Sequence, residues 1–170
     1  MSKIKNLNQI KSLSRKAHSN GQTVGLTTGC FDIIHTGHVN LFRFAKRHVD
    51  LLIVGVENDR NVNKSKGVGR PVHTSEKRID LLSELESVDY VFEIKKDINY
   101  NVKTADKDYS SLYRKVDPTH IFTTPKFDNY HKNKQKIARV SGIQYLALKK
   151  PLVHNSTTLI IQKTLNGEVD

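Results

Sequence analysis

The sequence predicts an α/β protein whose five-stranded parallel sheet is covered by helices on both faces. Short β-branched runs alternate along the chain with segments whose apolar residues recur at helical spacing, the order typical of strand–helix–strand units. One run, 51–56 (LLIVGV), is apolar throughout, as expected of a strand buried on both faces. Ligands bind such sheets outside the carboxyl ends of the strands, so the residues that follow each strand are the first candidates for a functional site.

Each element is placed by its periodicity and by the residues that begin or end it. Apolar residues at helical spacing from Leu7 to Ala17 predict a first helix, which Gly21 ends. Strands are expected at 23–28, 51–56, 88–94, 120–124 and 144–148. Further helices are expected from Gly37, from Thr74, at 111–116, at 130–140, and from Ser156 or Thr157 to Leu165. The stretches 58–72 and 95–109 are expected to be loops, the first with at most a short helix and the second long and exposed.

Length and composition favour one soluble domain. The 170 residues suit a single domain over 1–170, with an N-terminal helix in 1–21 and the core in 22–165. The one cysteine, Cys30, excludes an internal disulfide framework and a cysteine-based zinc finger. No apolar run approaches the ~18 residues of a membrane span, and the polar start is unlike a signal peptide. We therefore expect a cytoplasmic protein that does not enter the membrane.

A strong positive charge narrows the class of ligand without identifying it. Lys and Arg number 28 against 17 acidic residues, so the formal net charge is +11. Such a domain attracts nucleic acids, acidic lipids and phosphorylated metabolites alike. Aromatic residues make up only 7% of the chain and form no pattern that reads RNA, so nucleic acid is not the expected partner.

The residues most suited to chemistry directly follow the first predicted strand, in 28–38 (TGCFDIIHTGH). Gly29 lets the backbone approach a ligand closely, and Gly37 opens the next helix with free N–H groups. His35 and His38 flank this helix start, and two imidazoles beside a helix N-terminus can bind a polyphosphate. Two surface histidines near a turn are the plainer alternative. Zinc is a weaker one, because no third ligand stands at a useful spacing.

Three segments resemble one enzyme family. GCFDIIHTGH resembles the HxGH signature of the cytidylyltransferase-like nucleotidyltransferase superfamily, and 155–161 (NSTTLII) resembles its C-terminal STTxII motif. The stretch from Gly69-Arg70-Pro71-Val72 through Arg78 is similar to the RPV and arginine elements of that family. Together the three cover most of the chain in the family's order. The resemblance implies a Rossmann-like sheet and the transfer of a nucleotidyl group.

Within the superfamily, the chain is most similar to the D-glycero-beta-D-manno-heptose 1-phosphate adenylyltransferase domain. Both 21–41 and 50–72 (with LIVGV, KG and RPV) follow that group's pattern. The glycerol-3-phosphate cytidylyltransferases usually carry Thr at the position of Cys30 and an Arg where this chain has 149–151 (KKP). Relatives that adenylylate flavin mononucleotide match over a shorter stretch. Adenylyl transfer is preferred, with CTP and glycerol 3-phosphate as the alternative.

The resemblance implies a mechanism and a set of site residues. A phosphate oxygen of a phosphorylated sugar or polyol attacks the α-phosphorus of ATP or CTP, pyrophosphate leaves, and Mg²⁺ arrives with the triphosphate rather than on protein ligands. The expected catalytic residues are His35, His38 and Lys66. The expected nucleotide-binding residues are Thr28, Gly29, Cys30, Phe31, Asp32, Gly37, Ser156, Thr157 and Thr158. The expected substrate-binding residues are Lys64, Arg70 and Asp128. Asp32 is expected either to fix the HxGH turn or to help place Mg²⁺.

One segment departs from the family pattern. The relatives carry a glycine-rich turn with an aspartate after the fourth strand, whereas 123–130 (TTPKFDNY) has no glycine. Asp128 is the residue that could take that aspartate's part, and the departure leaves both base and acceptor open. The resemblance also implies a homodimer. A basic, nucleic-acid-binding relative that has lost turnover is the alternative from another functional class.

Overall fold

The computed structural model describes residues 2–98, 100, 104–149 and 157–167. Its strands form one fully parallel sheet in the order β3-β2-β1-β4-β5, which confirms the predicted fold class. The strands are β1 (Val24–Gly29), β2 (Leu51–Glu57), β3 (Tyr90–Ile94), β4 (His120–Thr123) and β5 (Gln144–Ala147). The chain builds outward from β1 to β3 and then returns to the other side of β1. The strand order therefore reverses between β1 and β4, the place where sheets of this kind hold ligands.

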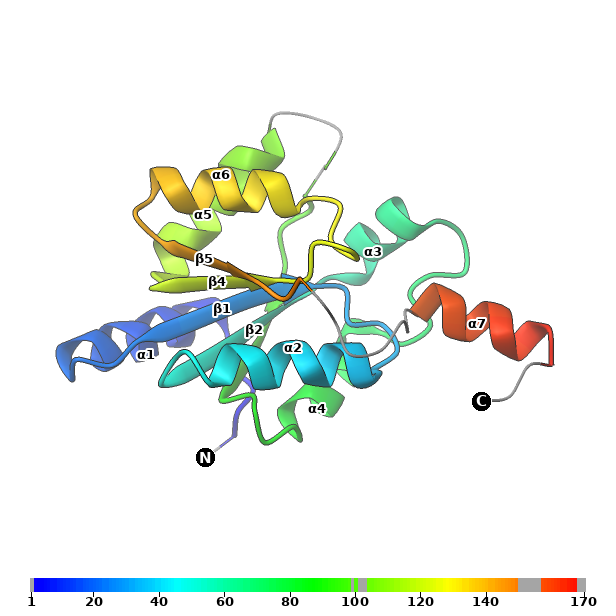
Figure 1. Cartoon of the computed structure of the whole chain (residues 1–170), viewed down its shortest axis with the longest axis horizontal. Helices are drawn as coiled ribbons and strands as arrows, with labels where there is room; N and C mark the ends of the chain where they lie inside the picture. Colours follow the sequence, from blue (N-terminus) through cyan, green and yellow to red (C-terminus); the bar gives the residue numbers. More distant parts are fainter. Residues whose placement is uncertain (1, 99, 101–103, 150–156, 168–170) are drawn as a thin grey trace.

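Helices cover both faces of the sheet, as Figure 1 shows. One face carries α1 (Leu7–Ser19), α5 (Thr104–Val116) and α6 (His131–Val140), and the other carries α2 (Thr36–Lys46) and α4 (Ser75–Ser83). Two short helices, α3 (Asp59–Lys66) and α7 (Thr157–Leu165), lie beyond the carboxyl ends of the strands. Both are therefore close to the expected site and outside the two packed layers.

Each face of the sheet has its own apolar core. The core under α1, α5 and α6 includes Ile10, Leu26, Ile53, Tyr109, Tyr113 and Ile121. The core under α2 and α4 includes Phe42, Leu52, Val54, Leu82, Val91 and Phe122. Neighbouring residues of the central strands face opposite cores, which explains why their sequence is apolar throughout rather than alternating.

The N-terminal segment closes the outer edge of the sheet. Lys5 donates its N–H to the Val91 carbonyl (2.9 Å), and Val91 donates to the Lys3 carbonyl (3.0 Å). The chain then enters α1 through a capping box in which Asn6 and Gln9 accept each other's backbone N–H. Pairing β3 in this way removes part of a free strand edge.

The prediction of a long exposed loop at 95–109 was wrong at its C-terminal end. α5 begins at Thr104, and both Ala105 and Tyr109 are fully buried. Its buried residues also include Leu112, Tyr113 and Val116, all on one helical face. Tyr109 and Tyr113 make up much of this apolar stripe. A prediction based mainly on aliphatic residues therefore begins the helix too late. The other elements lie where they were predicted, with differences at their ends, and α3 is the short helix allowed within 58–72.

Across the ranges that the structure describes, no helix has both the length and the apolar character needed to cross a membrane.

Gly25 provides a test of the packing between β1 and the core under α2. A Cβ at this position would lie 2.8 Å from both Phe122 Cε2 and Val49 Cγ2, closer than real Cβ contacts. We expect Gly25→Ala to lower the free energy of unfolding by about 1–3 kcal/mol through overpacking, measured by urea denaturation. An unchanged or higher midpoint would contradict the packing described here.

Candidate active site

The segment between β1 and α2 forms one wall of the site. β1 ends at Gly29, where a Cβ would lie 3.1 Å from the Phe31 ring. Phe31 has a φ of 47°, a left-handed conformation that few non-glycine residues adopt, and this turns the chain back toward α2. Its ring meets the edge of His38 at a centroid distance of 5.2 Å. Phe31 is thus a packing residue that helps to position the imidazole of His38.

The two histidines lie face to face at the start of α2. Their ring centroids are 3.8 Å apart, with 23° between the ring planes. His35 caps the helix by accepting the Gly37 N–H at Nδ1 (3.1 Å), so its neutral ring carries the proton on Nε2. The expectation that Gly37 offers a free N–H is therefore wrong, because His35 itself takes that donor. What His35 offers instead is its Nε2–H.

Both imidazoles are neutral near pH 7. Burial lowers the pKa of His38 to about 3, and the neighbouring His35 contributes to this shift. Burial also lowers the pKa of His35. The Nδ1 atom of His38 is buried and has no hydrogen-bond partner among the described residues. These rings therefore act through N–H dipoles rather than as cations.

Asp32 is committed to the architecture of the neighbouring segment. It is 1% exposed and accepts from Arg70 Nε (2.6 Å), Val72 N (2.8 Å) and His73 N (3.0 Å). All three partners lie in 70–73, so the carboxylate ties the turn after β1 to that segment. Arg70, expected to bind substrate, is held in an ion pair with Asp32.

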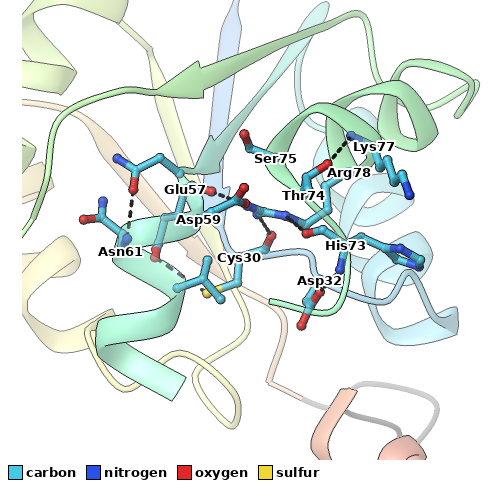
Figure 2. Close-up of polar contacts among 12 residues, drawn as sticks. Cys30, Asp32, Glu57, Asp59, Asn61, His73, Thr74, Ser75, Lys77 and Arg78 are labelled. Carbon is cyan, nitrogen blue, oxygen red and sulfur yellow. Dashed lines mark hydrogen bonds and ion pairs between the residues drawn. The ribbon is translucent and has the colours of Figure 1, made fainter. Parts of the chain in front are cut away.

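A fully buried arginine ties the site together (Figure 2). Arg78 on α4 donates Nη1 to the Cys30 carbonyl and Nε to the His73 carbonyl (3.0 Å). Its Nη2 donates to the Glu57 carbonyl (2.8 Å) and to the Asp59 carboxylate (2.7 Å). One guanidinium thus joins the carboxyl end of β2, the turn after β1, the start of α3 and the segment before α4. Arg78 belongs to a motif that the sequence shows, but it was not among the predicted site residues.

Cys30 lies beside a buried carboxylate that sequence analysis missed. Glu57 at the end of β2 accepts from Cys30 Sγ (3.6 Å) and from the Tyr100 hydroxyl (2.6 Å). Burial, together with Glu57, raises the pKa of the Cys30 thiol to about 12. The thiol is therefore protonated near neutral pH and is not poised as a nucleophile.

The two lysines of α3 have different surroundings. Lys64 is 58% exposed and forms an ion pair with Asp97 (3.5 Å). Lys66 is exposed at the end of α3, before Gly67, and its ammonium has no hydrogen bond or ion pair with any residue that the structure describes. The positive charge of Lys66 acts to lower the pKa of Cys30, the residue that follows β1. Lys66 is thus the lysine better placed to meet an anion there.

α7 reaches the same place from the other end of the sequence. The hydroxyl of Thr157 lies 3.4 Å from the backbone N of Ile33 and 3.5 Å from its carbonyl oxygen. In the sequence, Ile33 follows β1 and precedes His35. Two motifs more than a hundred residues apart therefore meet, at the long limit of hydrogen bonding. Thr158 is exposed, and Ser156 lies outside the described residues.

Asp128, expected to bind substrate, forms two hydrogen bonds within the protein. Its Oδ2 accepts from Lys134 Nζ (2.8 Å), and its Oδ1 accepts the Tyr130 N–H (3.0 Å). Sequence analysis missed Lys134. Its spacing from Ile137 and Ala138, all on one helical face, is the signal that could have revealed a buried lysine.

The assembled site is built to bind an anion. Around the carboxyl ends of β1 and β2 stand two neutral imidazoles, an exposed ammonium and the starts of two helices. Within the described part of the chain, no three His, Cys, Asp or Glu side chains are grouped so that they could hold a metal ion. Hydrogen-bond donors and dipoles, rather than metal ligands, are what these residues offer a polyphosphate.

Comparisons with known proteins identify the family to which the chain is similar. A family model described as cytidylyltransferase-like matches residues 26–163. "Bifunctional protein HldE" of Aliarcobacter butzleri (strain RM4018) is 40% identical over 101 residues, which are 59% of this chain and 21% of that protein. The protein of the same name from Granulibacter bethesdensis is 42% identical over 98 residues, which are 58% of this chain and 20% of that protein. The match thus spans about a fifth of the length of these curated relatives.

Two solved structures share the fold. A lipopolysaccharide core biosynthesis protein from Thermoplasma volcanium GSS1 has a TM-score of 0.58 and 24% identity, over 76% of this chain and 98% of that one. A pantoate-beta-alanine ligase from Francisella tularensis, complexed with beta-gamma ATP and beta-alanine, has a TM-score of 0.60 and 15% identity, over 99% and 79% of the two chains. At these identities the likeness shows the fold alone.

Arg78 should be essential to the folded site. Arg78→Met leaves three carbonyls and a carboxylate without their buried donor, and we expect a loss of about 3–5 kcal/mol in the free energy of unfolding. Lys77→Met, one residue away and exposed, is the matched control and should stay within about 0.5 kcal/mol of the parent. Equal unfolding midpoints for the two variants would contradict the role given to Arg78.

The depressed pKa of His38 should appear in the acid stability of the fold. The pKa of a histidine in the unfolded chain is near the ordinary value of 6.5, so below this pH the unfolded chain binds a proton at residue 38. The folded chain does not bind that proton until the pH falls to about 3. The free energy of unfolding should therefore fall as the pH falls through this range, by up to about 1.4 kcal/mol per pH unit for this residue. In His38→Asn the decline measured by urea denaturation should be shallower. Parallel pH profiles would show that His38 titrates normally.

Proposed function

The chain belongs to the cytidylyltransferase-like family of nucleotidyltransferases, and on this premise we propose that it is an adenylyltransferase acting on a sugar phosphate. The transferred group is the adenylyl group of ATP, and the acceptor is a sugar 1-phosphate of the heptose kind. The observation that carries the choice of ATP and sugar is the 40% identity to "Bifunctional protein HldE". The HxGH segment and the 50–72 stretch resemble that adenylyltransferase group in the same way.

The proposed reaction is an in-line displacement at the α-phosphorus. An anionic oxygen of the acceptor phosphate forms a bond to the α-phosphorus as the bond to the oxygen bridging to the β-phosphorus breaks. The electron pair and the negative charge leave with pyrophosphate. Because the nucleophile is already an anion, no general base is required, and catalysis consists of positioning and of stabilising charge.

The chain's own residues are suited to these tasks. His35 donates its Nε2–H toward the phosphates while its Nδ1 holds the helix start, so the ring cannot rotate freely. His38 is stacked on His35 and stays neutral near pH 7, so it acts as a neutral N–H donor and does not take up a proton. Lys66 supplies positive charge from the exposed end of α3. Each acts most strongly when charge builds on the leaving pyrophosphate.

A divalent cation fits this proposal as part of the nucleotide. Asp32, the carboxylate closest in sequence to the histidines, already accepts three hydrogen bonds from the protein. Mg²⁺ would therefore enter on the triphosphate's own oxygens, where it offsets their negative charge.

A second candidate is the transfer of a cytidylyl group to glycerol 3-phosphate or a similar alcohol phosphate. The turn at 123–130 supports this candidate, because it departs from the glycine-rich pattern of the adenylyltransferase group. The candidate shares the site and the displacement but changes the base and the acceptor.

Release of pyrophosphate tests the proposal. We would measure it with Mg²⁺, crossing ATP and CTP with a panel of heptose, hexose and polyol phosphates. Release is expected with ATP and a sugar 1-phosphate, and His38→Ala should reduce turnover by ~100-fold or more, the scale of one lost oxyanion donor. His18→Ala, on α1 at the opposite end of the sheet, is the control and should retain turnover.

Other outcomes would overturn parts of the proposal separately. Release only with CTP and glycerol 3-phosphate would replace the base and the acceptor and keep the mechanism. Equal turnover by His38→Ala and its parent would remove His38 from the mechanism. No release and no binding of either triphosphate, together with salt-sensitive binding of polynucleotide, would favour the nucleic-acid-binding alternative.

A further inference from the structure

Lys134 on α6 is a buried cation for which the proposed reaction has no direct use. The residue is 2% exposed, and its ammonium lies between the end of β1 and the turn after β4. It donates to the Thr28 carbonyl (3.2 Å) and to Asp128 Oδ2 (2.8 Å), and it lies 5.2 Å from the centre of the Tyr109 ring. The ammonium is therefore surrounded by a carbonyl, a carboxylate and an aromatic ring of the protein.

A buried ammonium at this position is costly. Transfer of a lysine charge out of water is penalised by several kcal/mol unless a partner compensates for it. The position is on the apolar face of α6, with Ile137 and Ala138, where an aliphatic residue would pack without that penalty. Burial acts to lower the pKa of Lys134, but Tyr109, Asp128 and Tyr113 together outweigh it and keep the pKa above its ordinary value. The charge is thus retained in the folded protein.

On the β1 side, Lys134 replaces a missing strand partner. The pairing of β1 with β4 ends at Thr27 and Phe122, so the two strands part at the next residue. The Thr28 carbonyl is therefore left just where the sheet opens, and Lys134 provides its donor. Gly29, where the backbone would approach a phosphate, follows immediately.

On the β4 side, Lys134 holds a turn that is hydrogen-bonded as one unit. Phe127 and Asp128 donate their N–H groups to the Thr124 carbonyl (2.9 and 3.1 Å), and Asp128 accepts the Tyr130 N–H. Because the Asp128 carboxylate is also bound to Lys134, the turn at 124–130 cannot move independently of α6. One ammonium therefore links both sides of the opening between β1 and β4.

We propose that Lys134 is a positioning residue that sets the distance between the Thr28–Gly29 backbone and the turn at 124–130, and so determines the affinity for the nucleoside triphosphate. The proposal rests on the proposed function, because it takes this opening as the nucleotide site. It also changes the part assigned to Asp128, which holds the turn in place rather than binding substrate. Selectivity for base then falls to the other side chains of the turn.

Lys134→Met tests the proposal, with Lys136→Met as the matched control on the exposed face of the same helix. Methionine keeps the length of the side chain and removes the charge. Because the substitution leaves Asp128 without its cation, the melting temperature should fall below that of the parent, and binding is compared at a temperature where both variants are folded. The Kd for ATP, measured by calorimetry without acceptor, should rise about tenfold, the scale of one lost hydrogen bond to a charged group.

Kinetics separate positioning from catalysis. In Lys134→Met we expect KM for ATP to rise with Kd while kcat at saturation is retained within about threefold, the pattern of lost uniform binding. His38→Ala should show the reverse, a large loss of kcat. A loss confined to kcat in Lys134→Met would overturn the proposal.

Asp128→Asn is the second variant and decides the matter if Lys134→Met does not fold. It keeps an acceptor for Tyr130 but loses the charge that fixes Lys134, so Kd should again rise. When both variants fold, the double variant should bind ATP no more weakly than the weaker single variant, because both act through one link. Additive losses, or an unchanged Kd in either single variant, would overturn the proposal.

Failure of the proposed function would be distinguishable from failure of this inference. If the parent binds neither ATP nor CTP, the nucleotide site itself is refuted. The linkage is still measurable by hydrogen exchange, where the amides of Phe127 and Asp128 should exchange faster in Lys134→Met than in Lys136→Met. Equal exchange rates would show that Lys134 does not hold the turn.

Discussion

The fully buried guanidinium of Arg78 is the interaction on which the rest of the site depends. At the carboxyl ends of parallel strands the ladder of hydrogen bonds stops, and the carbonyls there need other donors. Arg78 supplies them for the end of β2 and for the turn after β1, and it holds the first turn of α3 through Asp59. Lys134 performs the same task on the other side of β1, at Thr28. Two buried cations thus stand at the carboxyl ends of the strands: Arg78 contacts three backbone oxygens and a carboxylate, and Lys134 contacts one backbone oxygen and a carboxylate.

This framing explains how the acidic side chains near the site are used. Asp32, Asp59 and Asp128 each form an ion pair with a buried or half-buried cation, so each stabilises the fold around the site. Among the described residues of the site, Lys66 and the two uncharged imidazoles are open toward a ligand, and these are positive or neutral. A site with its carboxylates engaged and its donors free attracts a polyanion. The net charge of +11 adds a long-range attraction of the same sign.

The sequence predicted what is local and missed what depends on distant partners. The strands and the HxGH turn follow from runs and spacings a few residues long, and both lie where they were expected. The part of Asp32 depends on Arg70, 38 residues away, and Lys134 meets Thr28 across 106 residues, so neither contact leaves a local pattern. α5 was placed too late because Tyr109 and Tyr113 were not counted as core residues. Resemblance to the family predicted the candidate site residues, and only the fold showed which of their charges are already paired.

Transfer of label from the α-phosphate of ATP tests the central claim most directly. The protein would be incubated with Mg²⁺, α-labelled ATP and a sugar 1-phosphate, and the products separated. The account predicts that the label enters a nucleotide-linked sugar, with one pyrophosphate released for each label transferred. Label that remains in ATP, or that appears only in AMP while ATP is bound, would contradict it.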